Sequence, residues 1–528
     1  MTSAVEATVV LTGSPDYKFV HVEEDGIVTS YNPRTSFGEH QFFIYLEAQS
    51  SSIVYIPIVP TRLGDIEVKV HASTLLGSDR ITKMLHVEAD GLPQFRHQSI
   101  LLDLSSRSYA FQYMHVNVTE TPIIPYEVER YYVYGSNKAR ISVVGDVVGP
   151  IFSTMPVNAT SMLHLPMESA EQNMFSFAAN LYLIMYMRLI NQRNRTTEKE
   201  AFTHLNIGYQ RQMSYLMPDG SFSLFRSDWN QSASSVWLTA YCARTFQDAS
   251  FYEWENYIYI DPTVMQKNIA WLLRHQLPEG SFYEVTWSPD RKVNVSSNYK
   301  TSDIHDIGHH YNISLTAHVL ITLTTAKDLA AGLGSKVALA QQRAIQYLDQ
   351  KLVYLKDFGT PYEIAIVAYA LMLAKAPKAE AAFDLLTSHR KTIGEYSYWG
   401  NEDIPLPPTK LENQKYFSLP RLPYEFDALN IETTAYALLT YVQRQEVLVD
   451  PIVKWLNAQR LTDGGWASTQ DTGMAMKALI EYTVRSRIRD VSQLSITVEA
   501  TSLPGQSKIL RINDDNIAVL QSIEVRFS

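Results

Sequence analysis

The sequence predicts a multidomain protein in which β regions flank a large helical region. Short runs of alternating apolar and polar residues fill the first part of the chain and return at its end, which is typical of β-strands. Between them, from about residue 147 to 486, apolar residues recur at helical spacing. Within this helical region one short motif occurs repeatedly, which indicates stacked helical hairpins and favours an α/α toroid.

Residues 1–92 have the pattern of an antiparallel β-sandwich. The expected strands are short and are separated by Gly, Ser, Asp and Pro residues that favour turns. These strands span residues 7–11, 41–46, 52–58, 66–70 and 83–88.

Two further β segments lie on either side of the helical region. The first, residues 93–146, has expected strands at 98–104 and 140–144. The second follows the helices, and its expected strands are 494–500, 508–512, 518–520 and 523–527. Between two of these strands lies Asn513-Asp514-Asp515-Asn516, a loop whose carboxylates could hold calcium, but a polar hairpin turn is the simpler interpretation.

The helical region contains many segments with apolar residues three and four positions apart, and we expect each to form a helix. They span residues 175–190, 199–216, 234–246, 264–276, 314–329, 336–352, 364–373, 379–387, 433–441, 450–459 and 472–484.

The repeated motif ends a helix with Gln, continues through an acidic residue and Gly, and closes with an aromatic residue. Its copies are residues 212–222, 276–282 and 459–466. Glycine supplies the positive φ that a turn after a helix needs. We expect each aromatic residue to fill the base of the next hairpin, so that the aromatic stripes form core and not a ligand site.

The segment from Leu165 to Met174 joins a polar, β-branched stretch to a strongly apolar helix. By itself it predicts a strand-to-helix junction in which Ser169 caps the helix. Glu171 would then lie in the first turn, where the helix dipole favours an acid.

The same segment resembles the thioester site of the α2-macroglobulin/complement family. There a proline, a variable residue and the box Gly-Cys-Gly-Glu-Gln precede Asn-Met, and the cysteine thiol is joined to the glutamine side chain. Here the box is Glu168, Ser169, Ala170, Glu171 and Gln172. The Glu, the Gln and the following Asn-Met match, whereas the cysteine and both glycines are replaced.

The resemblance extends along the whole chain, through residues 206–212, 219–222, 237–240, 315–317 and 464–472. It implies a macroglobulin domain at 1–92. It also implies a CUB-type sandwich whose halves, 93–146 and 487–528, are interrupted by a thioester-type toroid at 147–486. Because its box lacks the cysteine, the chain resembles an insect macroglobulin complement-related branch of the family. Further domains would precede and follow this chain, which we expect to be a fragment.

The altered box predicts that no thioester forms. A thiolate leaves readily because a thiol has a pKa of roughly 8.5, whereas a serine alkoxide is a much poorer leaving group. In the family a histidine in the region that corresponds to residues 302–310 attacks the thioester. His305 would be its relic, although the ungapped register favours Asp303. We therefore expect no catalytic residue, no covalent attachment and no enzyme.

Two other kinds of site are less consistent with the sequence. On a helix, His305 and His309 would share a face as a zinc pair. Gly308 and the neighbouring acids favour a loop, and no third ligand follows, so we expect neither metal nor cofactor. Toroid enzymes need paired carboxylates in the central cavity or an acid-rich metal motif. The candidates Asp219, Glu402 and Asp403 are most simply turn residues.

Composition bears on the partner and the compartment. A formal net charge of −10 argues against nucleic acid. The single cysteine, Cys242, lies in an apolar helix and is expected to be buried; the lack of internal disulfides would by itself suggest the cytosol. Asn-x-Ser/Thr sequons favour the secretory route instead, and they lie at Asn117, Asn158, Asn194, Asn230, Asn294 and Asn312.

No signal peptide and no span long enough to cross a bilayer are visible in the sequence. We therefore expect a piece of a longer secreted, extracellular chain, associated with cell surfaces or junctions.

Three functions are consistent with these observations. The first is a non-covalent binding protein with protein, cell-surface or microbial ligands. For it the resemblance implies innate immunity by opsonisation and phagocytosis, or assembly of epithelial septate junctions. The second is a macroglobulin-type endopeptidase inhibitor, which needs a bait region and a protease partner in the full-length chain. The third is a toroid enzyme with carboxylates inside the ring.

Overall fold

The computed structural model describes residues 4–21, 34–88, 99–102, 104, 108–113, 138–148, 169–190, 193, 195–225, 234–250, 252–254, 256–286, 304–327, 329–400, 424–460, 465–466, 468–486, 493–499, 507–517 and 519–526. For some of these, including 304–311 and 424–429, it describes the backbone alone.

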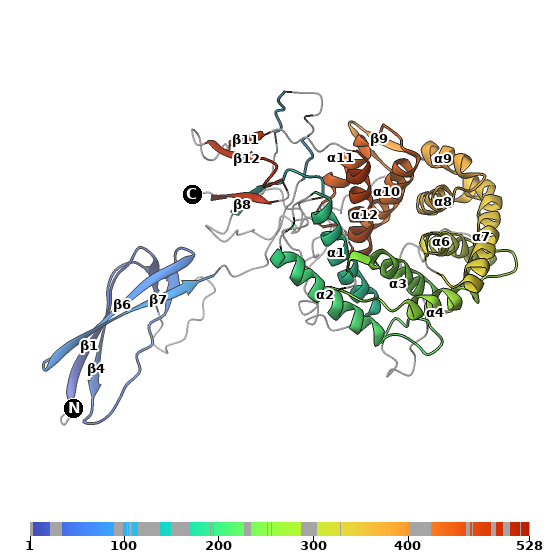
Figure 1. Ribbon diagram of the computed structural model, residues 1–528. Helices are drawn as coiled ribbons and strands as arrows, with labels where there is room; N and C mark the ends of the chain where they lie inside the picture. Colours follow the sequence, from blue (N-terminus) through green and yellow to red (C-terminus); the bar gives the residue numbers. More distant parts are fainter. Residues whose placement is uncertain are drawn as a thin grey trace.

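The N-terminal region forms two antiparallel sheets, which Figure 1 shows at one end of the molecule, away from the helices. The larger sheet has the order β4-β1-β6-β7 and the smaller one β3-β2-β5. Leu11, Tyr17, Phe19 and Ile66 form a small shared core. The strands are β1 (Val5–Leu11), β2 (Tyr17–Val20), β3 (Thr35–Ser36), β4 (His40–Leu46), β5 (Ile58–Pro60), β6 (Gly64–Thr74) and β7 (Gly77–Val87).

Two strands predicted before the helical region are wrong. Within 52–58 only Ile58 lies in a strand, because Pro57 has no N–H to donate and Ile53 and Tyr55 are exposed. The described part of 98–104 also contains no strand. Conversely, β2 and β3 were not predicted, since they are only four and two residues long. The two-sheet pattern is observed, and a complete sandwich stays a prediction.

Every predicted helix is present, with ends that differ by a few residues. The helices are α1 (Ala170–Leu189), α2 (Arg195–Met213), α3 (Val236–Ala249), α4 (Pro262–Leu273), α6 (Ile304–Thr325), α7 (Ala331–Phe358), α8 (Pro361–Leu373), α9 (Ala379–Ser388), α10 (Tyr424–Arg444), α11 (Asp450–Ala458) and α12 (Thr469–Ser486). The largest difference is at α6, which begins ten residues earlier than predicted. Residues 304–311 are therefore helical and not the expected loop.

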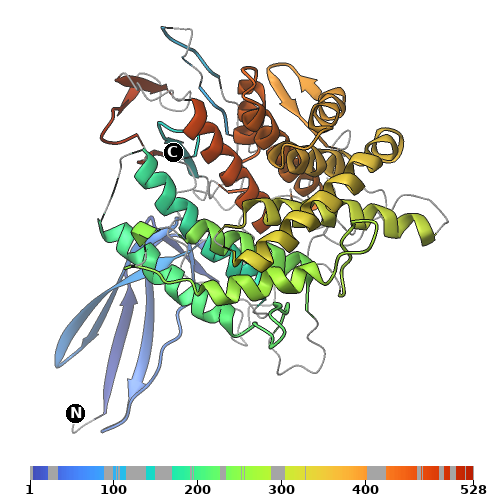
Figure 2. The same cartoon turned by 45° about the vertical axis from the view of Figure 1, so that its right-hand side comes forward.

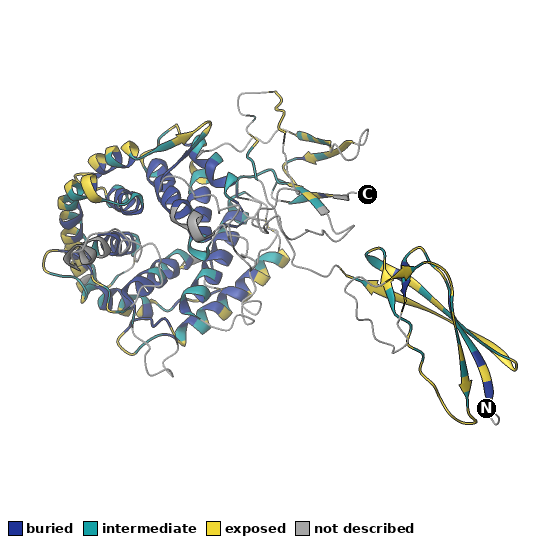
Figure 3. Cartoon of the chain, turned by 180° about the vertical axis from the view of Figure 1, so that it is seen from behind, coloured by how far each residue is buried: buried dark blue, intermediate teal, exposed yellow. Residues whose placement is uncertain are grey.

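These helices form two layers of a ring. The inner helices α1, α3, α6, α8, α10 and α12 each pack on the next, and α12 packs on α1, which closes the ring. Helices α2, α4, α7, α9 and α11 lie outside (Figures 1 and 2). In α8 every residue from Tyr362 to Leu371 is buried, as expected of a helix that is apolar on all sides. Figure 3 shows this buried interior.

Each repeated turn is held by the same hydrogen bond. The backbone N–H of Phe222 donates to Thr239 Oγ1 at 2.9 Å, and that of Phe282 donates to Thr316 Oγ1 at 2.8 Å. Trp466 donates to Thr472 Oγ1 at 3.0 Å. The glycines also behave as predicted, since Gly220 has a φ of 93° and Gly280 a φ of 105°.

A fourth copy of this turn was not predicted from the sequence. The Trp399 N–H donates to Thr434 Oγ1 at 3.1 Å. In this copy Tyr396 and Ser397 stand in place of the acidic residue and the glycine of the motif. They lie in strand β10 (Tyr396–Tyr398), which pairs with β9 (Lys391–Ile393).

The β segments on either side of the ring meet in space. Strand β8 (Lys138–Val143) pairs antiparallel with β13 (Gln521–Arg526), with Ile141 opposite Ile523. A second pair is β11 (Leu494–Glu499) with β12 (Ser507–Ile512). The pairing of β8 with β13 brings together segments that the sequence assigned to one interrupted domain. The described part of 518–520 contains no strand.

Among the helices that the structure describes, none is long and apolar enough to cross a bilayer.

Candidate functional site

The degenerate box lies at the start of α1, where Ser169 is the N-cap. Its backbone is extended, with φ −111° and ψ 147°, and its Oγ accepts a hydrogen bond from the Gln172 N–H at 3.3 Å. Ser169 thus satisfies one of the N–H groups that the first turn of a helix leaves open. Glu168 lies outside the described residues.

The next residues attach this turn to its neighbours. The buried Ala170 donates its N–H to Leu224 O at 3.0 Å. Glu171 accepts a hydrogen bond from Thr469 Oγ1 at 3.0 Å, which ties the start of α1 to the start of α12. The Gln172 side chain is half-buried. The box is therefore part of the joint that closes the ring.

Behind the box, a buried polar chain links α1, α2 and α3. Asn173 Nδ2 donates to Gln212 Oε1 at 2.8 Å and to Gly208 O at 2.9 Å. Gln212 Nε2 in turn donates to Cys242 Sγ at 3.3 Å. Cys242 has no exposed surface, as predicted. Sequence reasoning did not single out this chain, although Gln212 begins the first copy of the repeated motif.

Burial raises the pKa of the Cys242 thiol well above its usual value, although the hydrogen bond from Gln212 opposes the shift. The group is therefore a neutral thiol at physiological pH, which is a poor nucleophile. Because the sequence has only this cysteine, no thiol is available at position 169 to form a thioester with Gln172.

The other predicted residues do not join the box into a reacting group. His305 lies in the first turn of α6, but its side chain and those of His309 and His310 lie outside the described residues. Asp219 accepts hydrogen bonds from Ser221 and from Trp271 Nε1, so it stabilises a turn. Glu402 and Asp403 lie outside the description, and the described residues contain no His, Cys, Asp and Glu cluster suited to a metal.

Of the sequon asparagines, only Asn312 lies in the described part of the chain. It is half-buried within α6, and its sequon partners Ile313 and Ser314 are buried. Because a glycan needs an exposed acceptor, we do not expect Asn312 to be glycosylated.

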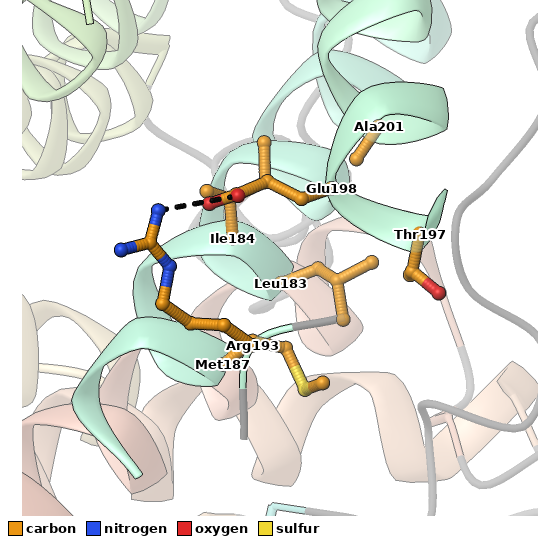
Figure 4. Close-up of a pocket in the computed structure, with 7 residues that line it drawn as sticks. All are labelled: Leu183, Ile184, Met187, Arg193, Thr197, Glu198 and Ala201. Carbon is orange, nitrogen blue, oxygen red and sulfur yellow. Dashed lines mark hydrogen bonds and ion pairs between the residues drawn. The ribbon is translucent and has the colours of Figure 1, made fainter. Parts of the chain in front are cut away.

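One small hollow lies between α1 and α2, and Figure 4 shows its lining. Leu183, Ile184 and Met187 form its apolar wall, and the ion pair between Arg193 and Glu198 at 3.3 Å closes its rim. Its volume of about 10 Å³ suits a single water molecule. It has no pair of reactive groups, so it is not a candidate active site.

Comparison with known proteins connects this geometry to a family. The model of the A-macroglobulin TED domain matches residues 141–482. Thioester-containing protein 1 allele S1 of Anopheles gambiae is 27% identical over 475 residues, which cover 88% of this chain and 30% of that protein. Ovostatin of Gallus gallus is 28% identical over 457 residues, which cover 84% of this chain and 27% of that protein. The chain spans less than a third of the length of these curated relatives.

Proposed function

Because this chain belongs to the A-macroglobulin TED-domain family, we propose that it is a secreted, non-catalytic member that binds protein or cell-surface ligands without a covalent bond. Residues 1–92 would be its macroglobulin-like domain. Residues 93–146 and 487–528 would be the halves of a CUB-like domain, and 147–486 the thioester-type toroid inserted between them.

The observation that carries this proposal is the state of the box. Ser169 is engaged as the cap of α1, and its hydroxyl accepts the Gln172 N–H. The only thiol of the chain is buried and held by Gln212, which lies on a different helix from the box. Without a thiolate leaving group, the Gln172 carbonyl has no activated form from which a ligand could accept an acyl bond.

The ring itself would then serve as a rigid support for recognition. Family members are protease inhibitors or binding proteins and not classical enzymes. Opsonisation of microbes for phagocytosis and assembly of septate junctions are the settings that the family resemblance favours. Sequons in the chain support an extracellular location, with Asn312 as the exception.

A protease-inhibitor role is the second candidate, favoured by the similarity to ovostatin over 84% of this chain. In this family inhibition needs a bait region, so the function would belong to a longer chain. Cleavage of the full-length protein followed by retention of the protease would support it.

The decisive experiment is methylamine incorporation at Gln172, read by peptide mass spectrometry on the native protein. We expect no labelling, whereas a relative with the complete Cys-containing box is labelled in parallel. Labelling at Gln172 would show that its carbonyl is activated despite Ser169 and would overturn the proposal.

A binding assay completes this test. Protein captured on cells or microbial surfaces should be released completely by denaturant, and hydroxylamine should release no more. A Ser169→Ala variant should bind equally well, because Ser169 serves only as a helix cap. A denaturant-resistant fraction that disappears in this variant would indicate an ester through Ser169.

A further inference from the structure

A segment of four residues connects the ring to the strands that flank it. Gly145 donates its N–H to Ile517 O at 2.9 Å, in the connection between β12 and β13. A Cβ at Gly145 would lie 2.6 Å from Ile512 Cγ2, so this backbone packs directly on β12. Three residues later, Val148 has no exposed surface and belongs to the core of the ring. Residues 145–148 are therefore anchored in the strands at one end and in the ring at the other.

The contact between these strands and the ring is otherwise narrow. Among the described elements, none of the strands β8, β11, β12 and β13 packs extensively on a helix of the ring. Figure 1 shows them as a separate group beside the helices. Leu101 also packs against the core of the ring, but it is only half-buried. The orientation of the strands relative to the ring therefore depends largely on residues 145–148.

A buried arginine of the ring holds this segment. Arg460 lies just after α11 and is 3% exposed. Its Nη2 donates to the Val147 carbonyl oxygen, and its Nε donates to Asn457 Oδ1 at 2.9 Å. Its guanidinium carbon lies 4.3 Å from the centroid of the Trp466 ring. A buried guanidinium is tolerated only where acceptors and an aromatic face compensate it, and Val147 supplies one of these acceptors from outside the ring.

Asp146 supports the same contact from within the segment. Its Oδ1 accepts the N–H of Val148 at 2.9 Å, which closes a short turn between the strands and the ring. Burial lowers the pKa of Arg460 to about 9, against the effect of the Asp146 charge, so the guanidinium stays charged at neutral pH. Removing the segment would therefore leave a charged group in the ring without the Val147 acceptor, which is costly.

Only one of the four repeated turns carries this arginine. Six residues before its aromatic residue, the copy at 459–466 has Arg460, whereas the other copies have Leu216, Gln276 and Ile393. All four turns form the same hydrogen bond to a threonine hydroxyl. The turn therefore does not need a charge at this position, and the contact of Arg460 with Val147 is specific to the copy that faces the strands.

We propose that residues 145–148 are a latch that holds the ring and the flanking strands in one orientation, and that Arg460 closes it. Opening the latch withdraws Val148 from the core of the ring and breaks the hydrogen bond to Val147, while the helices and the strands each stay folded. The ring then turns relative to the strands as a unit. This inference goes beyond the proposed function, because it depends neither on the box nor on the ligand.

Hydrogen–deuterium exchange on the whole chain tests the latch at its own amides, since those of Gly145 and Val148 are both hydrogen-bonded. Arg460→Met keeps the apolar part of the side chain and removes the charge. Exchange at residues 145–148 should become roughly ten- to hundredfold faster, the effect of losing a hydrogen bond to a charged group. Arg485→Met is the matched control, because Arg485 donates to the Val442 carbonyl at 2.8 Å within the ring. It should leave this exchange unchanged.

Helix α8 is the internal reference for the stability of the ring. Its exchange should not change in Arg460→Met. Equal acceleration in α8 and at residues 145–148 would show that Arg460 supports the ring as a whole, and it would overturn the proposal, as would unchanged exchange at 145–148. Gly145→Val reaches the latch from the strand side through the contact with Ile512, and it should accelerate exchange at Val148 but not in α8.

Distances between two spin labels measure the orientation itself. Because Cys242 is buried, labels can be attached selectively to cysteines introduced at the exposed Thr497 of β11 and Thr203 of α2. With the latch intact we expect one narrow distance distribution, and with Arg460→Met or Gly145→Val a broader one. A broad distribution with the latch intact would show that the ring is not fixed. An equally narrow one in both variants would show that residues 145–148 do not fix it.

Discussion

Gln212 Nε2 donates a hydrogen bond to Cys242 Sγ at 3.3 Å, directly behind the turn that carries the degenerate box. The contact joins α2 to α3, and Asn173 extends it to α1 through Gln212 Oε1. The single thiol of the chain is therefore part of the packing between three helices and is not positioned for reaction.

The first prediction concerns the reactivity of this thiol. Cys242 is fully buried and its pKa is raised, so the native protein should not react with Ellman's reagent over hours. In denaturant, one thiol per chain should react at once. Rapid reaction of the native protein would mean that α3 opens locally or that the thiol is exposed.

The second prediction concerns the polar chain. Gln212→Leu removes the acceptor of Asn173 and the donor to Cys242, and it should lower the free energy of unfolding by about 1–3 kcal/mol. Urea denaturation with a constant m-value measures this. Cys242→Ala is the matched control: if the Gln212–Cys242 contact matters, the two changes together should cost less than their sum.

The third prediction concerns the repeated turn. Thr316→Val keeps the shape of the side chain but leaves the buried Phe282 N–H without an acceptor. We expect a loss of about 1–3 kcal/mol in urea denaturation, and Thr316→Ser should recover most of it. Equal stability of the Val and wild-type proteins would show that the hydrogen bond is not what fixes the hairpin.

The fourth prediction contrasts two glycines. A Cβ at Gly280, where φ is 105°, would lie 2.2 Å from Arg343 O. Gly280→Ala should therefore lower the free energy of unfolding by about 1–3 kcal/mol or more. Gly332 lies in α7 with open space around it, so Gly332→Ala should leave stability unchanged or raise it by up to about 1 kcal/mol.

The sequence predicted the ring well because its signals are local. Within the described residues, apolar spacing located every α-helix, and the Gly-aromatic motif located three of the four turns that share this hydrogen bond. The sequence-based prediction was wrong for the strand at 52–58 and for the loop around Gly308. The run at 52–58 alternates like a strand, but Pro57 has no N–H to donate and only Ile58 lies in a strand. Gly308 favoured a loop because glycine has a low helix propensity, yet it lies within α6.

The candidate site shows the same division. The cap at Ser169 was predictable from residue type and position. The contact of Gln212 with Cys242 joins α2 to α3, and the spacing of residues along either helix does not indicate it.

The last prediction concerns pH. His318 is 3% exposed, its ring stacks on Trp237, and its Nε2 is hydrogen-bonded to the Trp237 carbonyl oxygen at 3.2 Å. Burial, and then the charge of Arg244, hold its pKa well below 6.5. Below pH 6.5 the unfolded chain therefore takes up a proton at this residue and the folded chain does not. Stability should fall by up to about 1.4 kcal/mol per pH unit from pH 6.5 downwards, until the folded pKa is reached.

Urea denaturation at pH 7.5, 6.5, 5.5 and 5.0 would measure this slope. His318→Phe keeps the stacked ring and cannot titrate, so its stability should depend less on pH in this window, by about one proton. The lost hydrogen bond shifts the whole curve and leaves the slope as the diagnostic. His86 offers the opposite sign, since its hydrogen bond with Asp65 raises its pKa and its stabilisation is lost as the pH rises. An unchanged slope in His318→Phe would show that His318 is protonated in the folded ring.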